Sequence, residues 1–386
     1  MKLLSAPLAA LILTSFPTVV FGQSELGDVP EGRLLLSQCP ADQSRSGDTC
    51  LANSIAPGAS EAAPELFTLD SAGERQVTDN DLFEFGGAAW APSGKKVAVS
   101  SSPFTRDVEE CRAYVVRVAT GAATPITPDQ DLACALAEDW SPDGEWILMT
   151  VRFHDGPIQL YKVRPDGTGL RALTDYHGEG QTVDGARFID KGRKILHWGS
   201  PARTEEIRVM RADGRPIRML LKVPYSRSSP KLLGPVEVAP NGRRVAFVIY
   251  DGSDKTHDPD EVFVIDVDGS HRRRLTFNEI DETALSWGPD GERLAVVLGS
   301  MYDADATPGI KIIPVGAGSV VKLERPADGA VYRWGAPVWS PSGDHVAFIV
   351  ENDSGGEAVY VGDARNGNIT RVTDFHRTFD LFSWTP

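Results

Sequence analysis

The chain of 386 residues is poor in positive charge, with 39 lysines and arginines against 54 aspartates and glutamates and a formal net charge of −15. We therefore do not expect it to bind nucleic acid through a basic surface, and an anionic membrane is unfavourable for the same reason. Its four cysteines form no C-x-x-C pair and no close Cys/His cluster, which excludes the common zinc sites. The G-x-S-x-G, H-E-x-x-H and phosphate-loop motifs are also missing.

Long apolar runs are confined to residues 1–22. A single charge, Lys2, precedes an apolar stretch that ends in Val20-Phe21-Gly22. Such a stretch with small residues at its end is typical of a cleaved secretory signal peptide. An uncleaved anchor is the alternative, because the run approaches the ~20 residues that cross a bilayer. Two prolines in the run favour cleavage, so we predict a signal peptide over residues 1–22 and a periplasmic or secreted protein without membrane insertion.

The even number of cysteines predicts disulfides, because the chain carries an export signal. Three pairings are possible. We prefer Cys39 with Cys50 and Cys111 with Cys134, because each pair closes a short segment.

One motif recurs about every fifty residues: an aromatic residue, a proline two positions later and a glycine two positions after that. Clear copies begin at Trp90, Trp140, Trp287 and Trp339, and degenerate copies begin at Phe188 and Val238. An apolar strand follows each copy, and further segments rich in β-branched and aromatic residues complete a unit of four antiparallel strands. A regular period of this length without helical stretches indicates propeller blades.

The two ends of the chain supply complementary parts of this motif. Trp384-Thr-Pro386 lacks the glycine and the following strand, whereas Glu31-Gly32 and the apolar strand after it lack the aromatic residue and the proline. We therefore predict that strand 32–38 completes the blade begun at residues 382–386, which removes an exposed sheet edge. The predicted fold is all-β, a seven-bladed β-propeller of four-stranded antiparallel blades over residues 23–386.

The motif resembles a known family repeat. The W-S-P-D-G hairpin at Trp140 and the R-x-L-T-D strand at Arg171–Asp175 are similar to the WD-like repeat of TolB-type β-propellers. This resemblance covers essentially the whole mature chain and implies an extracytoplasmic scaffold for interactions. It is limited to the propeller, which is usually counted as six blades in TolB, and we expect no counterpart of the α/β domain that precedes it there.

The loops after the second and fourth strands of each blade should open on one face, the long-loop face, opposite the motif hairpins. Function on a propeller usually resides in such loops. Four histidines with neighbouring carboxylates fall there, and converging His and Asp can bind a divalent cation or act as acid and base. The candidate ligands for calcium or a transition metal are Asp175, His177, Asp374 and His376, and the candidate binding-face residues are His154, His257, Asp258 and Trp334. The plainer interpretation is that these polar loops are only solvated.

Two hypotheses of function follow. The first is an exported, non-catalytic, monomeric scaffold that binds an extracytoplasmic protein or polysaccharide through the long-loop face. The alternative is a metal-assisted hydrolase or lyase of a glycan or lactone that uses the loop His and Asp residues. The tryptophans of the motif are predicted to pack between blades, because they recur in register.

Overall fold

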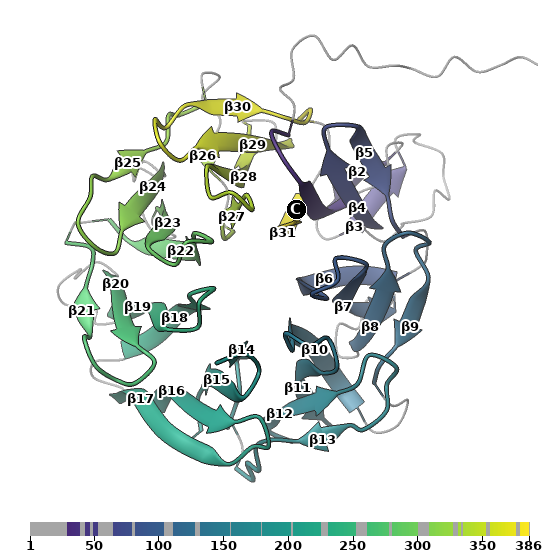
Figure 1. Cartoon of the computed structure of the whole chain (residues 1–386). Coiled ribbons are helices and arrows are strands. Elements are labelled where there is room, and N and C mark those ends of the chain that lie inside the picture. Colours follow the sequence, from purple (N-terminus) through teal and green to yellow (C-terminus); the bar gives the residue numbers. More distant parts are fainter. Residues whose placement is uncertain are drawn as a thin grey trace, which may run out of the picture.

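The computed structural model describes residues 29–38, 43–46, 49–52, 65–78, 82–103, 111–127, 132–154, 156–178, 180–201, 204–224, 231–251, 261–277, 280–299, 309–326, 331–332, 335–352, 356–375 and 379–385. These residues form strands and turns, and seven of their sheets are arranged as a ring (Figure 1). We call the axis of this ring, which the inner strands surround, the central channel. Within these ranges, no helix is long and apolar enough to cross a membrane. The predicted seven-bladed, all-β propeller is confirmed.

Each blade is an antiparallel sheet whose first strand lines the channel. Blade 1 contains β6 (Leu82–Trp90), β7 (Lys96–Pro103), β8 (Arg112–Arg117) and β9 (Ala123–Pro125). Blade 2 contains β10 (Leu132–Trp140), β11 (Ile147–Phe153), β12 (Ile158–Val163) and β13 (Arg171–Ala172). Blade 3 contains β14 (Gly185–Ile189), β15 (Lys194–Gly199), β16 (Thr204–Arg211) and β17 (Pro216–Pro224).

The remaining blades follow the same order. Blade 4 contains β18 (Lys231–Val238), β19 (Arg244–Asp251), β20 (Glu261–Asp266) and β21 (Arg273–Arg274). Blade 5 contains β22 (Glu282–Trp287), β23 (Arg293–Leu298), β24 (Gly309–Pro314) and β25 (Val321–Lys322). Blade 6 contains β28 (His345–Glu351), β29 (Glu357–Asp363) and β30 (Ile369–Arg371), and its inner strand consists of two pieces, β26 (Val331–Tyr332) and β27 (Val338–Trp339).

The seventh blade joins the two ends of the chain, as predicted. Its strand order is β31 (Phe379–Thr385), β1 (Arg33–Gln38), β4 (Glu65–Asp70) and β5 (Gly73–Gln76). Leu34 lies opposite Trp384 in the antiparallel β31–β1 pair and opposite Leu69 in the β1–β4 pair. A separate two-stranded sheet, β2 (Gln43–Ser46) and β3 (Thr49–Ala52), lies between β1 and β4 in the chain.

The hydrophobic core is divided among the interfaces between neighbouring blades. One cluster combines Ala98 and Val115 of blade 1 with Trp140 and Met149 of blade 2. The Trp140 indole N–H donates to the carbonyl oxygen of Ala89 in the preceding blade at 2.8 Å. Equivalent bonds run from Trp287 to Glu237 (3.0 Å) and from Trp339 to Ser286 (3.2 Å). The predicted packing of the motif tryptophans between blades is confirmed at these positions.

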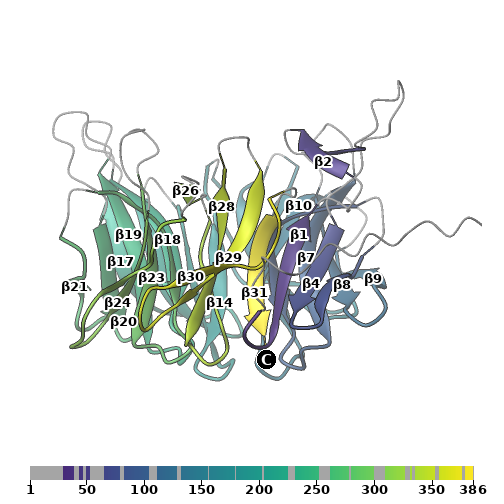
Figure 2. The same cartoon turned by 90° about the horizontal axis from the view of Figure 1, so that it is seen from above.

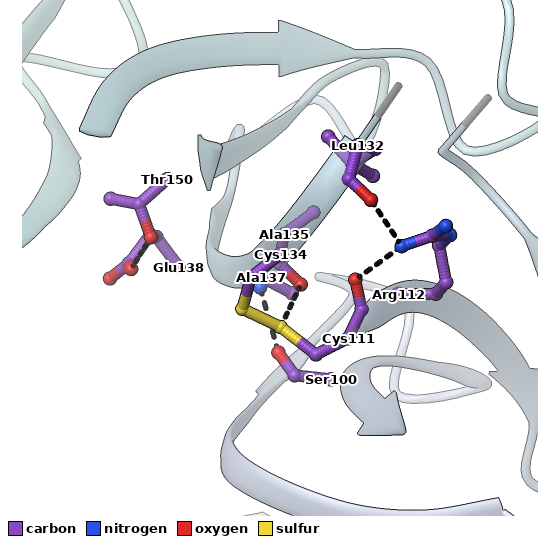
Figure 3. The surroundings of a disulfide bond; sticks show 9 residues. All are labelled: Ser100, Cys111, Arg112, Leu132, Cys134, Ala135, Ala137, Glu138 and Thr150. Atoms are coloured by element: carbon purple, nitrogen blue, oxygen red, sulfur yellow. Dashed lines mark hydrogen bonds between the residues drawn. A yellow bond between two sulfur atoms is a disulfide. The ribbon is translucent and has the colours of Figure 1, made fainter. Parts of the chain in front are cut away.

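A disulfide adds a covalent link between blades 1 and 2. Cys111 precedes β8, and Cys134 lies in β10. Figure 3 shows the bond between their two sulfur atoms. The Arg112 guanidinium donates to the carbonyl oxygens of both Cys111 (3.2 Å) and Leu132 (2.9 Å), which holds the same two segments together. The preferred pairing of Cys111 with Cys134 is confirmed, whereas Cys39 lies outside the described residues.

The two ends of the ring differ in the turns that they present. The motif hairpins join first to second strands, and a second set of turns joins third to fourth strands, so both sets lie at one end, the hairpin end (lower end of Figure 2). In blade 3 the motif hairpin between β14 and β15 contains Asp190 and Lys191 with φ of 52° and 57°, followed by Gly192 with φ of 82°. Positive φ is unfavourable for a lysine, and the turn holds the Lys191 side chain exposed at this end.

Candidate functional site

Two of the predicted metal ligands, Asp175 and His177, form a pair at the long-loop end. His177 Nε2 lies 3.2 Å from Asp175 Oδ1 in the turn after β13, with 80% and 87% of the two side chains exposed. The Gln181 side chain fixes this turn by accepting hydrogen bonds from the backbone N–H groups of His177 (2.9 Å) and Gly178 (2.7 Å). The pair is therefore positioned by its own loop but remains open to solvent.

The other predicted site residues do not join this pair among the described positions. Asp374 follows β30 of blade 6, so blades 7 and 1 separate it from Asp175 in blade 2. His154 is exposed after β11. Across the described ranges, no group of three or more His, Cys, Asp or Glu side chains is arranged to hold a metal ion. Four candidates lie outside the described residues: His257, Asp258, Trp334 and His376.

A different group of charged residues lines the central channel. The position directly before the motif aromatic is Asp139 in blade 2, Arg187 in blade 3 and Glu237 in blade 4. The same position holds Ala89, Ser286 and Val338 in blades 1, 5 and 6. Consecutive blades thus bring a carboxylate, a guanidinium and a second carboxylate next to one another, because the repeat places this position at the same level of each inner strand.

Arg187 is the centre of this group. Its guanidinium donates to the carbonyl oxygens of Glu138 (2.7 Å) and Ala186 (2.9 Å) and lies 3.6 Å from Glu138 Oε2. The Arg187 side chain keeps 35% of its surface accessible because it faces the channel, whereas the Glu138 side chain keeps 13%. Asp139 Oδ2 accepts a hydrogen bond from the Phe188 N–H at 2.7 Å. Among the described residues, the Glu237 carboxylate has no hydrogen bond and no ion pair within salt-bridge distance.

The low polarity of the channel wall changes the protonation of these groups. Burial raises the pKa of Asp139 to about 6, against the opposing effect of Arg187. Burial also raises the pKa values of Glu138 and Glu237. Burial acts to lower the pKa of Arg187, but the carboxylates, with Asp139 first, raise it overall. The guanidinium stays charged, and the three carboxyl groups of Glu138, Asp139 and Glu237 share this single positive charge.

A cavity of about 360 Å³ opens beside this group at the hairpin end of the channel. Arg187 and Glu237 form its charged wall, and prolines of the motif hairpins, including Pro240 and Pro289, form its rim. The Ser286 hydroxyl, buried in the wall, has no hydrogen-bond partner among the described residues. Shape, charge and an unused hydroxyl together make this cavity a candidate ligand site.

The sequence contains a signal for this site in the residue that precedes each motif aromatic. The aromatic residues define the register, and the residue before each of them is small or uncharged in blades 1, 5 and 6 but charged in three successive blades. The three charged residues therefore differ from the small or uncharged residues that occupy the same repeat position in the other blades named. Such departures concentrate at functional sites.

Comparison with known proteins gives distant sequence relatives. No family model matches the chain. An uncharacterized protein of Agrobacterium fabrum is 26% identical over 218 residues, which cover 54% of this chain and 67% of the relative. The Tol-Pal system protein TolB of Gluconobacter oxydans is 46% identical over 56 residues, which cover 14% of this chain and 11% of that protein.

Solved structures resemble the chain over most of its length. TolB from Acinetobacter baumannii superposes with a TM-score of 0.50 at 15% identity, covering 92% of this chain and 67% of TolB. Oligogalacturonate lyase in complex with manganese gives a TM-score of 0.58 at 15% identity, covering 87% of this chain and 85% of the lyase. Puromycin hydrolase gives 0.60 at 18% identity, covering 88% of this chain but only 54% of the hydrolase. These likenesses show the fold: the chain is a seven-bladed β-propeller, and TolB is among the solved propellers that it resembles.

Proposed function

We propose that this protein is an exported, non-catalytic scaffold that binds a protein or a polysaccharide. The observation that carries the proposal is the cavity at the hairpin end of the channel, with its excess of carboxylates around Arg187. Burying ionisable groups without full compensation lowers the free energy of unfolding, and such groups are a recurrent feature of recognition and catalytic sites. A closed ring supports recognition because its inner strands hold the lining side chains in fixed positions.

The charge of the cavity favours a cationic group on the ligand. Asp139 and Glu237 flank Arg187 from the two neighbouring blades, and Glu138 adds a third carboxylate. Glu237 is the carboxylate that lines the cavity, and among the described residues its side chain makes no hydrogen bond and no salt bridge. A protonated amine, as carried by a lysine side chain or an amino sugar, would complete the set of charges there. The long-loop face, with His154 and the Asp175–His177 pair, remains a second proposed contact surface at the other end of the ring.

Binding of amine-bearing probes tests this function. Oligolysine and chitosan oligomers are titrated into the mature protein by calorimetry, with N-acetylated chitin oligomers as the uncharged counterpart. We expect binding of an amine probe that weakens at least tenfold in Glu237→Gln. Glu145→Gln is the matched control, because Glu145 is an exposed carboxylate of a motif hairpin away from the channel cavity. Equal affinity in both variants, or turnover of either probe, would contradict the proposal.

We also propose that the protein works outside the cytoplasm as a monomer, after removal of residues 1–22. The Cys111–Cys134 disulfide supports an oxidising compartment. The mass of the protein purified from its host checks the cleavage before Gln23, and light scattering checks the oligomeric state. A cytoplasmic, full-length protein would contradict this part of the proposal.

A metal-assisted hydrolase or lyase of a glycan or lactone is the second candidate function. The specific observation in its favour is the 3.2 Å pair of His177 and Asp175, to which Asp374 and His376 would have to be added from blade 6. Calorimetric titration with manganese and calcium, followed by assays on pectate and lactones, tests it. Metal binding and turnover that are both lost in His177→Ala would favour this function over the scaffold.

A further inference from the structure

The positive charges of this acidic protein are concentrated on one part of its surface. Exposed lysines and arginines gather in the turns at the hairpin end of blades 1–4, and we call them the basic arc: Lys95, Arg117, Arg164, Arg171, Lys191, Arg193, Arg211, Arg215, Arg243, Arg272 and Arg273. The carboxylates in the same turns are fewer: Asp143, Glu145, Asp166, Asp190, Asp213, Asp266 and Asp268. This part of the surface is positive although the whole chain has a net charge of −15.

The rest of the hairpin end has the opposite balance. The corresponding turns of blades 5–7 carry the cations Arg33, Arg75, Arg293, Lys322 and Arg365. They also carry more carboxylates: Glu31, Asp70, Glu74, Asp290, Glu292, Asp344 and Asp363. A flat anionic membrane laid against this end would meet both halves of the ring and be repelled by one of them. A narrow anionic partner can follow the positive half alone.

Some cations of the region hold neighbouring blades together. Lys162 Nζ donates to the carbonyl oxygen of Ala212 in blade 3 at 2.8 Å, and the Arg171 guanidinium donates to that of Asp213 at 3.3 Å. The guanidinium of Arg273 likewise donates to the carbonyl oxygen of Val315 in blade 5. These residues have a structural role, and their charges are only partly available to a partner.

Other members of the basic arc have no such role. The side chains of Lys191, Arg211 and Arg243 are exposed, and within the described part of the chain they make no hydrogen bond and no ion pair. Keeping like charges close together raises the electrostatic energy of the folded protein. The concentration of cations without an ion pair on three neighbouring turns is therefore explained better by an anionic partner than by folding.

A groove between blades 1 and 2 gives the arc a shaped recess. Its volume is about 300 Å³, and Lys96, Arg117 and Arg164 contribute its cationic lining. The Asp166 carboxylate in the same groove already accepts hydrogen bonds from the N–H (2.9 Å) and hydroxyl (2.7 Å) of Thr168. Glu145 is the other carboxylate, so the cations are in excess and can hold a single carboxylate or sulfate group.

We propose that the basic arc binds a linear anionic polysaccharide. Both kinds of turn recur in each blade, so the cations are presented at repeated positions along a curve. A polysaccharide with an anionic group on each repeating unit offers matching charges along an extended chain, which a folded acidic protein does not. The polymer would follow the rim from the groove between blades 1 and 2 to the turns of blade 4, outside the channel cavity.

The experiment compares two triple variants of the mature protein that lose the same charge. One is Lys191→Gln/Arg211→Gln/Arg243→Gln in the arc, and the other is Arg152→Gln/Lys322→Gln/Arg325→Gln, which removes cations outside it. The probes are polygalacturonate, dextran sulfate and neutral dextran, with affinities measured by interferometry at low and physiological salt. We expect the wild type to bind the two anionic polymers but not dextran, with affinity falling as salt rises.

The arc variant should bind at least tenfold more weakly, and the control variant should bind within threefold of the wild type. If both variants bound the polymers equally more weakly than the wild type, the proposal would be overturned, because binding would then depend on the net charge of the protein and not on the basic arc. Equally tight binding of poly-L-glutamate, or tighter binding of anionic vesicles, would overturn the choice of a polysaccharide. Glu237→Gln is measured in parallel and should leave polymer binding unchanged, so this result is independent of the proposed channel site.

Discussion

The indole N–H of Trp384 donates a hydrogen bond to the carbonyl oxygen of Glu31 at 2.6 Å, although the two residues are 353 positions apart in the chain. Trp384 is buried against Leu34, Leu36 and Val361, so the last strand of the chain is held by the first and by blade 6. The ring is closed by noncovalent contacts between the two ends of the chain. Its free energy of unfolding should therefore depend strongly on this one blade.

Trp384→Ala should lower the free energy of unfolding by about 3–5 kcal/mol, the usual cost of removing a buried tryptophan side chain. Urea unfolding followed by circular dichroism measures the change. Phe277→Ala is the control, because Phe277 is 76% exposed and its removal should cost little. A loss below about 1 kcal/mol in Trp384→Ala would mean that the closing blade does not limit stability.

The disulfide between blades 1 and 2 should be a main contributor to stability. Cys111 and Cys134 are 23 residues apart, and a loop of that length predicts about 3 kcal/mol from the restriction of the unfolded chain. The double variant Cys111→Ser/Cys134→Ser should unfold at correspondingly lower urea concentration than the oxidised wild type. If reduced wild type and double variant differ clearly in midpoint, the effect comes from the substituted side chains and not from the lost bond.

The channel carboxylates should make the protein less stable as the pH rises. The folded-state pKa of Asp139 is raised from 3.8 to about 6, so its contribution to stability is complete below pH 3.8 and is lost as the pH rises through 6. Asp139→Asn removes this loss, about 3 kcal/mol for a shift of this size. We measure the free energy of unfolding of variant and wild type at pH 4 and at pH 7. From pH 4 to pH 7 the wild type should lose stability relative to the variant. Parallel pH profiles would contradict the assignment.

His197 should produce the opposite dependence. It is buried in β15, and burial, together with the charge of Arg208, lowers its pKa from 6.5 to about 4. A lowered histidine pKa contributes stability above pH 6.5 that is lost as the pH falls towards 4, here by about 3 kcal/mol. His197→Gln should remove this part of the acid sensitivity. Titration of the His197 ring by NMR gives the direct check, and a midpoint near 6.5 would contradict the expected burial effect.

The fold was predictable because its information is local and repeated. Each copy of the motif encodes one hairpin, in which Gly144, for example, takes a φ of 73° that other residues rarely adopt. Trp384 and Glu31 could be matched across the whole chain because each half of the motif lacked what the other supplied. The pairing of Cys111 with Cys134 was predictable for a related reason, since neighbouring blades place corresponding segments side by side, here the start of β8 and the strand β10.

The candidate site was less predictable. The loop histidines and their neighbouring carboxylates were predicted as metal ligands because these residue types bind metal ions. Asp175 and Asp374, however, belong to blades that are separated around the ring. Asp139, Arg187 and Glu237 carried no motif of their own and lie about fifty residues apart in the chain. Only the alignment of the repeats in space brings them together, and only burial raises the pKa values of the two carboxyl groups, Asp139 and Glu237.

The amino-acid sequence by itself determined the number of blades, the closure of the ring and the positions of the packing tryptophans, because hairpin geometry and hydrophobic pattern act over a few residues. The excess of 54 acidic over 39 basic residues argued against a basic surface. A net charge, however, does not say where on the surface the individual charges lie. The tertiary structure decided that question. By placing the turns of successive blades at one end, it separates Lys191, Arg211 and Arg243 from most of the carboxylates and turns an acidic chain into a protein with a positive arc.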